Sequence, residues 1–187
     1  GDLDGDGYVD IVVADGSSSV PVLLNEGNGS FAPLVRYGAP GGVKAVALGD
    51  LDGDVDRDIV AITQSNASVF LNQGNGTFAP YVGYGTGTNS ISVAIGDLDG
   101  DGDRDIVVAN ASSKNVSILD NLGDGTFSPL SPLSPNRPLK ALALGDLEID
   151  GDLDLVLAIY DENIGPPLAG LLVYVNQGNG AFASPVQ

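Results

Sequence analysis

The feature that most constrains the fold of this chain is that its sequence repeats four times. An Asp-rich nonapeptide preceded by glycine recurs along the chain, starting at Asp2, Asp50, Asp97 and Asp146. The intervals between these starts are 48, 47 and 49 residues. A second marker, Gly-Asn/Asp-Gly-X-Phe, keeps a similar rhythm apart from an extra loop over 161–169, and ends at Phe31, Phe78, Phe127 and Phe182. A fixed period of this length indicates stacked copies of one supersecondary unit.

Between these markers the pattern is that of β-strands. Short apolar runs rich in β-branched residues follow the nonapeptides, at 11–14, 59–62, 106–109 and 155–159. Equally short runs precede the later three nonapeptides, at 45–48, 92–95 and 141–144. Third strands are expected at positions such as 68–71 and 116–119, and the repeated Phe is expected to open a fourth. Runs of this length, bounded by turn-forming residues, predict strands rather than helices.

A repeat of about 40 to 50 residues with four strands is typical of a propeller blade. We therefore predict an all-β fold, a β-propeller segment whose blades have four antiparallel strands, spanning 1–187 as one unit. The four repeats occupy about 1–40, 41–88, 89–136 and 137–187. The first blade lacks its first strand, because no apolar run precedes Asp2. This gap predicts self-association, or a longer chain that completes a ring of seven or eight blades. A solenoid would have a shorter period, and a sandwich would not repeat its loops so regularly.

The nonapeptides, here named loops 1 to 4, occupy 2–10, 50–58, 97–105 and 146–154. They hold 19 of the 25 acidic residues, and the chain has a formal charge of -18. So many carboxylates in short segments repel one another unless a multivalent cation compensates them. Carboxylates at positions 1, 3 and 5, with a carbonyl at position 7, provide the all-oxygen shell that Ca²⁺ prefers. The sequence therefore predicts up to four Ca²⁺ ions, one in each loop. Plain solvated turns would not need this pattern four times.

Each loop ends in an acid at position 9, which is predicted to supply the closing carboxylate. The carboxylate ligands expected at positions 1, 3, 5 and 9 are Asp2, Asp4, Asp6 and Asp10; Asp50, Asp52, Asp54 and Asp58; Asp97, Asp99, Asp101 and Asp105; and Asp146, Glu148, Asp150 and Asp154. The pattern is not an EF-hand, because no loop has a Glu at position 12. Val55 replaces glycine at position 6 of loop 2 and is expected to resist a positive φ. Glu148 and Ile149 replace the Asp-Gly pair of loop 4. Loops 1 and 3 are therefore expected to be the better sites.

The pattern DxDxDGxxD after an apolar strand, followed by GNGxF and by Tyr-Gly at 37–38 and 84–85, resembles the FG-GAP and VCBS repeats. These repeats form the propeller of integrin α-subunits and of many bacterial surface proteins, some fungal lectins and some polysaccharide lyases. The resemblance implies that loop positions 1, 3, 5 and 9 bind calcium together with the position 7 carbonyl. The carbonyl donors would then be Tyr8, Asp56, Asp103 and Asp152. Leu133 stands in the third repeat where the first two have tyrosine.

Composition narrows the function. The chain has no Cys or His, which removes disulfides and the commonest general base. Its negative charge opposes nucleic-acid binding, and no apolar run is long enough for membrane insertion. Loops of this kind usually need the millimolar calcium found outside cells, so we expect an extracellular or cell-surface protein, with the periplasm as another possibility.

We expect a non-catalytic adhesion or recognition module whose partner is an unidentified protein or glycan. A lectin is the first alternative, although the chain lacks Trp and offers only Tyr37, Tyr84 and Tyr160 as sugar platforms, each better explained as packing between blades. Part of a polysaccharide lyase, catalytic or not, is the second. Lys44 and Lys140 would then be the candidate bases, yet they recur at matched positions before the first strand, which favours a structural role.

Overall fold

The computed structural model describes residues 1–161 and 168–186, which form fourteen β-strands in four antiparallel sheets. No helix in this described part of the chain is long and apolar enough to span a membrane. The extra loop expected over 161–169 lies largely outside the described residues. The all-β architecture predicted from the repeats is confirmed.

We name the sheets blades 1 to 4 in chain order. Blade 1 contains β1 (Ile11–Val12), β2 (Ser19–Leu23) and β3 (Val35–Gly38). Blade 2 contains β4 (Ala45–Gly49), β5 (Asp58–Ile62), β6 (Asn66–Phe70) and β7 (Val82–Gly85). Blade 3 contains β8 (Ser90–Gly96), β9 (Asp105–Asn110), β10 (Asn115–Asn121) and β11 (Phe127–Pro129). Blade 4 contains β12 (Leu139–Gly145), β13 (Asp154–Asp161) and β14 (Leu168–Tyr174).

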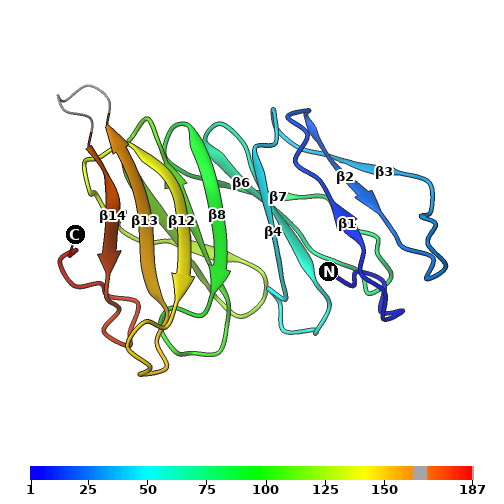
Figure 1. The fold of residues 1–187 in the computed structure, drawn as a ribbon. Coiled ribbons are helices and arrows are strands. Elements are labelled where there is room, and N and C mark those ends of the chain that lie inside the picture. The colour runs from blue at the N-terminus through cyan, green and yellow to red at the C-terminus, as the bar shows by residue number, and fades with distance from the viewer. Residues whose placement is uncertain (162–167, 187) are drawn as a thin grey trace.

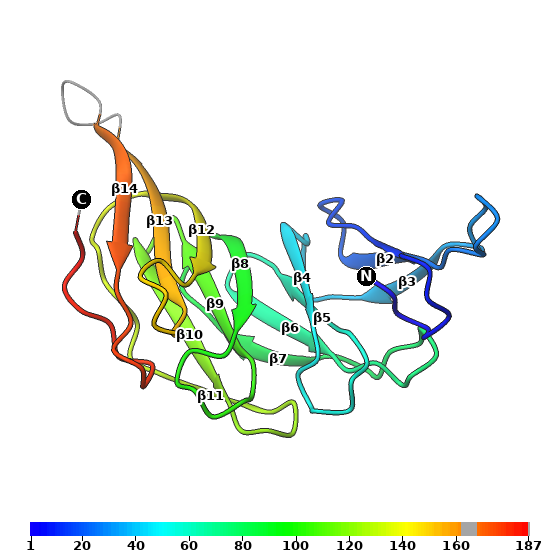
Figure 2. The same ribbon diagram turned by 60° about the horizontal axis from the view of Figure 1, so that its bottom comes forward.

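Within each blade the strands pair in chain order, so every connection is a hairpin. The four blades follow one another along an open arc with the two termini at opposite ends (Figures 1 and 2). The inner strand β8 contacts both β4 and β12, which brings the first strands of blades 2 to 4 together. Blade 1 has no strand before loop 1, as the sequence predicted. The arrangement is that of consecutive propeller blades.

The fourth strand is the least regular part of a blade. Phe127 opens β11 as predicted, but β3 and β7 begin four residues after the corresponding Phe31 and Phe78. Those two residues form isolated bridges instead, and so does the Phe of blade 4. Proline stands two residues after the Phe in blades 1 to 3. Because proline has no N–H group, the ladder of hydrogen bonds cannot continue through it.

The core lies between blades and not within them. Along β5, Ile59 and Ala61 pack toward blade 1, whereas Val60 and Ile62 pack toward blade 3. Strand β9 divides its side chains in the same way between blades 2 and 4. Successive strand residues point to opposite faces, and a strand covered on both faces reads as a continuous apolar run. This explains why the central strands show no polar alternation in the sequence.

The acidic loops emerge at one edge of the arc, the lower edge in Figure 1. Loop 2 joins β4 to β5, loop 3 joins β8 to β9, and loop 4 joins β12 to β13. Loop 1 leads into β1. The repeat therefore places four acidic loops in equivalent positions on neighbouring blades.

Candidate metal centres

Each loop is folded by its own first carboxylate. In loop 1, Asp2 accepts the N–H of Gly5 through Oδ1 at 2.9 Å and that of Gly7 through Oδ2 at 3.0 Å. Asp97 of loop 3 holds the corresponding two N–H groups at 2.8 and 3.0 Å. The two glycines of loop 1 have φ of 76° and 89°, a region that residues with a β-carbon rarely adopt. The Asp-Gly spacing thus suits the backbone conformation of the loop.

The two departures from the glycine pattern keep this loop conformation. Val55 adopts φ of 81°, and its N–H reaches Asp50 Oδ2 at 3.0 Å, as glycine does in loops 1 and 3. Ile149 adopts φ of 63°, and its N–H reaches Asp146 Oδ1 at 2.7 Å. The expected resistance of Val55 to positive φ therefore does not prevent closure of loop 2. Both residues carry backbone strain, because the left-handed region costs a side-chain-bearing residue about 1 kcal/mol or more.

The position 9 carboxylates are buried and act as internal struts. Asp58 accepts the N–H of Leu51 at 2.7 Å and that of Asn72 at 2.8 Å, one on each oxygen. The other three loops repeat this pair of contacts, through Asp10, Asp105 and Asp154. Each strut ties position 2 of its loop to an asparagine at or just after the end of β2, β6, β10 or β14 in the same blade. A carboxylate oxygen has a second acceptor site, so these contacts are compatible with metal binding as well.

Three of the four loops bring carboxylates together. In each group, three carboxylate oxygens lie within 4.8 Å of one another, and the groups are Asp2–Asp4–Asp6, Asp50–Asp52–Asp58 and Asp97–Asp99–Asp101. Among the described residues, loop 4 forms no such group, although all nine of its residues are described. The grouping thus separates loop 4 from the others, whereas loop 2, which was expected to be weaker together with loop 4, groups its carboxylates as loops 1 and 3 do.

The position 7 side chains point away from the carboxylates. The carboxylates of Asp56, Asp103 and Asp152 lie against the first glycine of the turn in their own blade. The ring of Tyr8 lies against the equivalent Gly27. This placement of the side chains is compatible with a carbonyl-donor role for position 7, which stays a prediction.

The donor set suits a hard divalent cation. The Oδ1 atom of Asp52 is buried and has no hydrogen-bond partner among the described residues. Burial, together with the charges of Asp54 and Asp50, raises the pKa of Asp52 above its usual range. A buried carboxylate oxygen without a donor is unfavourable unless a cation compensates it. All-oxygen carboxylate groups are the ligands that Ca²⁺ takes.

The struts of loops 2 and 3 are also electrostatically unfavourable without a cation. Burial raises the pKa of Asp58 to about 7 and that of Asp105 to about 6, although two backbone N–H groups act in the opposite direction on each. The neighbouring Asp52 and Asp54 add to the shift of Asp58, and Asp99 and Asp120 to that of Asp105. A bound cation would favour the ionised form of these groups.

The candidate sugar platforms are mostly packing residues. Tyr37 meets Phe78 edge-on at 5.1 Å between ring centroids, and Tyr84 meets Phe127 at 5.3 Å. Tyr160 is 38% exposed, with Lys140 Nζ 5.7 Å from its ring. The sequence analysis missed Tyr81, which is 38% exposed and lines a cavity of ≈ 360 Å³ with Arg36, Tyr37 and Phe70 among others. Its position three residues after the repeated Phe was the available signal.

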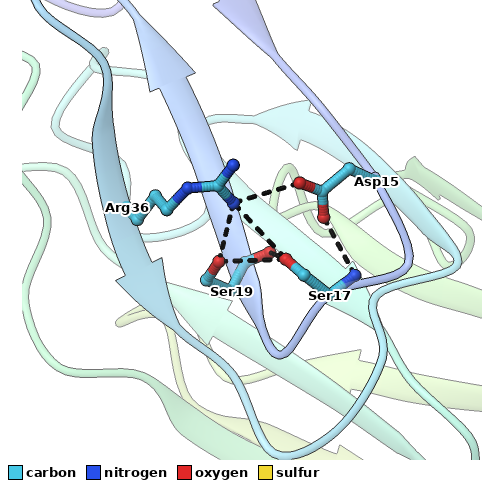
Figure 3. Close-up of polar contacts among 4 residues, drawn as sticks. All are labelled: Asp15, Ser17, Ser19 and Arg36. Atoms are coloured by element: carbon cyan, nitrogen blue, oxygen red, sulfur yellow. Dashed lines mark hydrogen bonds and ion pairs between the residues drawn. The ribbon is translucent and has the colours of Figure 1, made fainter.

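Arg36, at the rim of this cavity, is fixed by a polar cluster on blade 1 (Figure 3). Its Nη1 atom donates to Asp15 Oδ2 at 3.0 Å and to Ser19 Oγ at 3.1 Å. Hydrogen bonds from Ser17, and then the Arg36 guanidinium, lower the pKa of Asp15 to about 2.

A second group that the sequence analysis missed is a set of asparagines that begin the Asn-X-Gly-X-Gly turns. The turns occupy 25–29, 72–76, 121–125 and 176–180, and we name them glycine turns. Three of these asparagines are buried, namely Asn72, Asn121 and Asn176. The signal was present in the sequence, because each asparagine stands six residues before the repeated Phe.

Comparison with known proteins gives the family and the fold. A family model described as FG-GAP-like repeat matches residues 2–61, 50–108 and 97–157. The chain is similar to an Agrocybe aegerita lectin that specifically recognises non-reducing terminal N-acetylglucosamine, with 25% identity and a TM-score of 0.65 over 99% of this chain and 50% of the lectin. No curated protein shows significant similarity to the sequence.

Two further solved structures share the fold at lower identity. The Tc holotoxin pore of Photorhabdus luminescens has 19% identity and a TM-score of 0.56, over 97% of this chain and 9% of that one. The V. cholerae biofilm matrix protein Bap1 has 18% identity and a TM-score of 0.58, over 98% and 26%. The chain thus spans half or less of the length of these three proteins.

Proposed function

Because this chain belongs to the FG-GAP-like repeat family, we propose that it is a calcium-binding, non-catalytic module for adhesion or recognition at an extracellular or cell-surface site. In this proposal calcium rigidifies the acidic edge of each blade, and the blades together form a rigid surface to which a protein or glycan partner binds. Membership of the family supports the location, since such repeats are typical of extracellular proteins.

The observation that carries the calcium assignment is the unpartnered, buried Oδ1 atom of Asp52 within the group formed with Asp50 and Asp58. Positions 1, 3 and 5, the position 7 carbonyl and the second acceptor site of position 9 would hold the ion. A bound Ca²⁺ would compensate the carboxylate charges and join the two strands that flank each loop. Loops 1 to 3 are the proposed sites of highest affinity, because they contain the grouped carboxylates.

Titration calorimetry with CaCl₂, and separately with MgCl₂, tests the assignment. We expect Ca²⁺ to bind and Mg²⁺ to bind more weakly, because Mg²⁺ demands a tighter octahedron. Asp101→Asn should remove one site. Asp124→Asn is the matched control, because it makes the same charge change on an exposed residue and gives the Gly-Asn-Gly sequence of the other turns. Absence of calcium binding, or an equal loss in both variants, would refute the proposal.

A glycan-binding function is the second candidate, and one observation favours it. The chain resembles a lectin over 99% of its length, and the cavity beside Tyr81 offers an exposed aromatic ring next to Arg36. Glycan arrays probed with and without chelator would test this function. A glycan ligand whose binding is lost in Tyr81→Ala would support it, and an array without signal would refute it.

The proposal that the module is non-catalytic is supported by the contacts of Lys44 and Lys140, the two lysines considered as candidate bases for a lyase. Lys44 Nζ donates to Gln64 Oε1 at 2.9 Å and to Asn89 Oδ1 at 2.7 Å. Lys140 lies over the ring of Tyr160. Both amines are engaged in contacts within the fold, which supports the structural role expected for them. Turnover of an acidic polysaccharide by the purified chain would overturn this part of the proposal.

A further inference from the structure

The glycine turn of each later blade contacts the acidic loop of the blade before it. Asn121 of blade 3 donates from Nδ2 to the carbonyl of Leu51, which is position 2 of loop 2, at 2.9 Å. The same bond joins Asn72 to Leu3 at 2.8 Å and Asn176 to Leu98 at 2.7 Å. Each asparagine also donates to the position 8 carbonyl of its own acidic loop, at 2.9 to 3.1 Å. The bond to the preceding loop is therefore an addition that crosses the blade interface.

A second contact repeats at the same interfaces. A β-carbon placed on Gly125 would lie 3.3 Å from the β-carbon of Asp52, the position 3 residue of loop 2. The distances at the other interfaces are 3.3 Å for Gly76 with Asp4 and 3.4 Å for Gly180 with Asp99. The last glycine of each turn thus packs against a proposed calcium ligand of the preceding blade. Its lack of a side chain is what permits this close approach.

These contacts fix the peptide that carries the position 3 ligand. In loop 2, the N–H of Leu51 is held by Asp58 from the same blade, and its carbonyl is held by Asn121 from the next blade. Asp52 follows directly, and its Oδ1 atom is the buried oxygen without a partner. The direction of that carboxylate is therefore set jointly by two blades.

The loops that group their carboxylates are the same loops that a following blade contacts. Loops 1, 2 and 3 each have a following glycine turn against position 3, and these are the three loops with grouped carboxylates. Among the described residues, no glycine turn from a following blade packs against position 3 of loop 4, and the acids of loop 4 are not grouped. Sequence differences in loop 4 contribute as well, since Glu148 and Ile149 replace the usual pair.

From these contacts we infer that each calcium site is built by two blades. The loop of one blade supplies the ligands, and the glycine turn of the following blade, through its asparagine and last glycine, positions the position 3 carboxylate. This inference rests on the proposed calcium binding. Residues that orient metal ligands without touching the metal typically change metal affinity 10- to 100-fold when they are replaced. The near contacts of Gly125 lie in blade 2, so Gly125 should control loop 2 and not loop 3. Asn121 should control loop 2 and, through the Arg104 carbonyl, also contribute to its own loop 3.

The chain contains its own control in blade 1. Asn25 begins the same glycine turn but donates from Nδ2 only to Val9, in its own loop, among the described residues. Gly29 has the same left-handed backbone as Gly125, with φ of 90° and 74°, yet a β-carbon on Gly29 would meet nothing within 4 Å. Gly29→Ala therefore reproduces the backbone strain of Gly125→Ala without the contact across the interface.

The experiment is a CaCl₂ titration of the wild type, Asn121→Ala, Asn25→Ala, Gly125→Ala and Gly29→Ala, followed by NMR. The amide signals of Gly5, Gly53 and Gly100 report on loops 1, 2 and 3 separately. In Asn121→Ala and Gly125→Ala we expect the Kd of loop 2 to rise about 10-fold or more. Loop 3 should change by less than about 2-fold in Gly125→Ala. In Asn121→Ala it should change by no more than loop 1 changes in Asn25→Ala, which loses the same bond to its own loop. The Asn25→Ala and Gly29→Ala variants should leave loop 2 at its wild-type affinity.

Equal weakening of loops 2 and 3 in Gly125→Ala, or an unchanged loop 2 in both blade 3 variants, would overturn the inference while leaving calcium binding intact. A wild type that does not bind calcium would instead refute the proposed function, and the inference with it. If Asn121→Ala does not fold, Asn176→Ala provides the same test at the last interface, with loop 3 as the loop that must weaken.

Discussion

Replacing two aspartates of loop 3 tests whether one of them stabilises the fold without calcium and the other only with calcium. Asp105 is 3% exposed and accepts two backbone N–H groups, from Leu98 and Asn121, each at 2.9 Å. In Asp105→Asn one of these N–H groups faces an amide NH₂ and loses its acceptor. A buried donor without a partner costs about 1–3 kcal/mol. For a chain of this length that loss lowers the melting temperature by roughly 2–12 °C.

Asp101→Asn in the same loop should behave differently. Asp101 is exposed, and its Oδ1 atom accepts the N–H of Asp103 at 2.9 Å, a bond that asparagine can keep. Without calcium this variant should melt within about 2 °C of the wild type, as is usual for exposed sites. In calcium at 100 times the Kd it should forfeit about 2.7 kcal/mol, the stabilisation that one occupied site supplies.

The assay is a thermal melt of both variants at pH 8, once in EDTA and once in CaCl₂. The pH is chosen so that Asp105, whose pKa burial raises to about 6, is ionised in the wild type. Asp105→Asn should lose stability in both solutions, and Asp101→Asn only with calcium. The reasoning is refuted if Asp105→Asn matches the wild type in EDTA, or if Asp101→Asn loses as much there as Asp105→Asn does.

Three further outcomes are expected. The pKa values of Asp58 and Asp105 are raised to about 7 and about 6, so protonation of these groups stabilises the calcium-free fold at low pH, and this stabilisation is lost as the pH rises through 6 to 7. Thermal melts in EDTA should therefore show higher stability at pH 5 than at pH 8. Saturating CaCl₂ should reverse this order. Val55→Gly should raise the melting temperature by about 2–4 °C, because it removes about 1 kcal/mol of left-handed backbone strain at a residue that is 84% exposed. A lower melting temperature would contradict this expectation. In Arg36→Ala, NMR titration should find the pKa of Asp15 raised from about 2 but still below its usual value, because the hydrogen bonds from Ser17 remain.

Most of the fold could be predicted from the sequence, because the repeat fixes both the length and the number of blades. Apolar runs such as 59–62 were long enough to mark strands, and the structure confirms them as part of β5. The start of the fourth strand could not be predicted from the Phe alone. Pro33 and Pro80 interrupt the ladder after Phe31 and Phe78, so the strands resume only at Val35 and Val82.

The candidate site was predictable in composition but not in its connections. Spacing alone identified the acids and ranked loops 2 and 4 below loops 1 and 3, but the carboxylates are grouped in loop 2 as well, because Val55 adopts the positive φ that glycine adopts elsewhere. It could not show that the position 9 acids hold two backbone N–H groups. Nor could it show that Asn121 reaches Leu51, since these residues are 70 positions apart and meet only when blades stack. The pattern within one repeat carries no information about which residues of the next repeat it contacts.

Burial along the loop separates the chemistry of its acids. In loop 2, Asp54 is exposed, Asp52 is half-buried, and Asp58 is fully buried. An exposed carboxylate contributes little to the fold without a cation, whereas a buried one that accepts two N–H groups is part of the fold whether or not a cation is bound. The half-buried Asp52 lies between these extremes, because the fold buries one of its oxygens without giving it a donor. That oxygen links the two roles, since a cation bound there would satisfy a group that the packing of two blades has already removed from water.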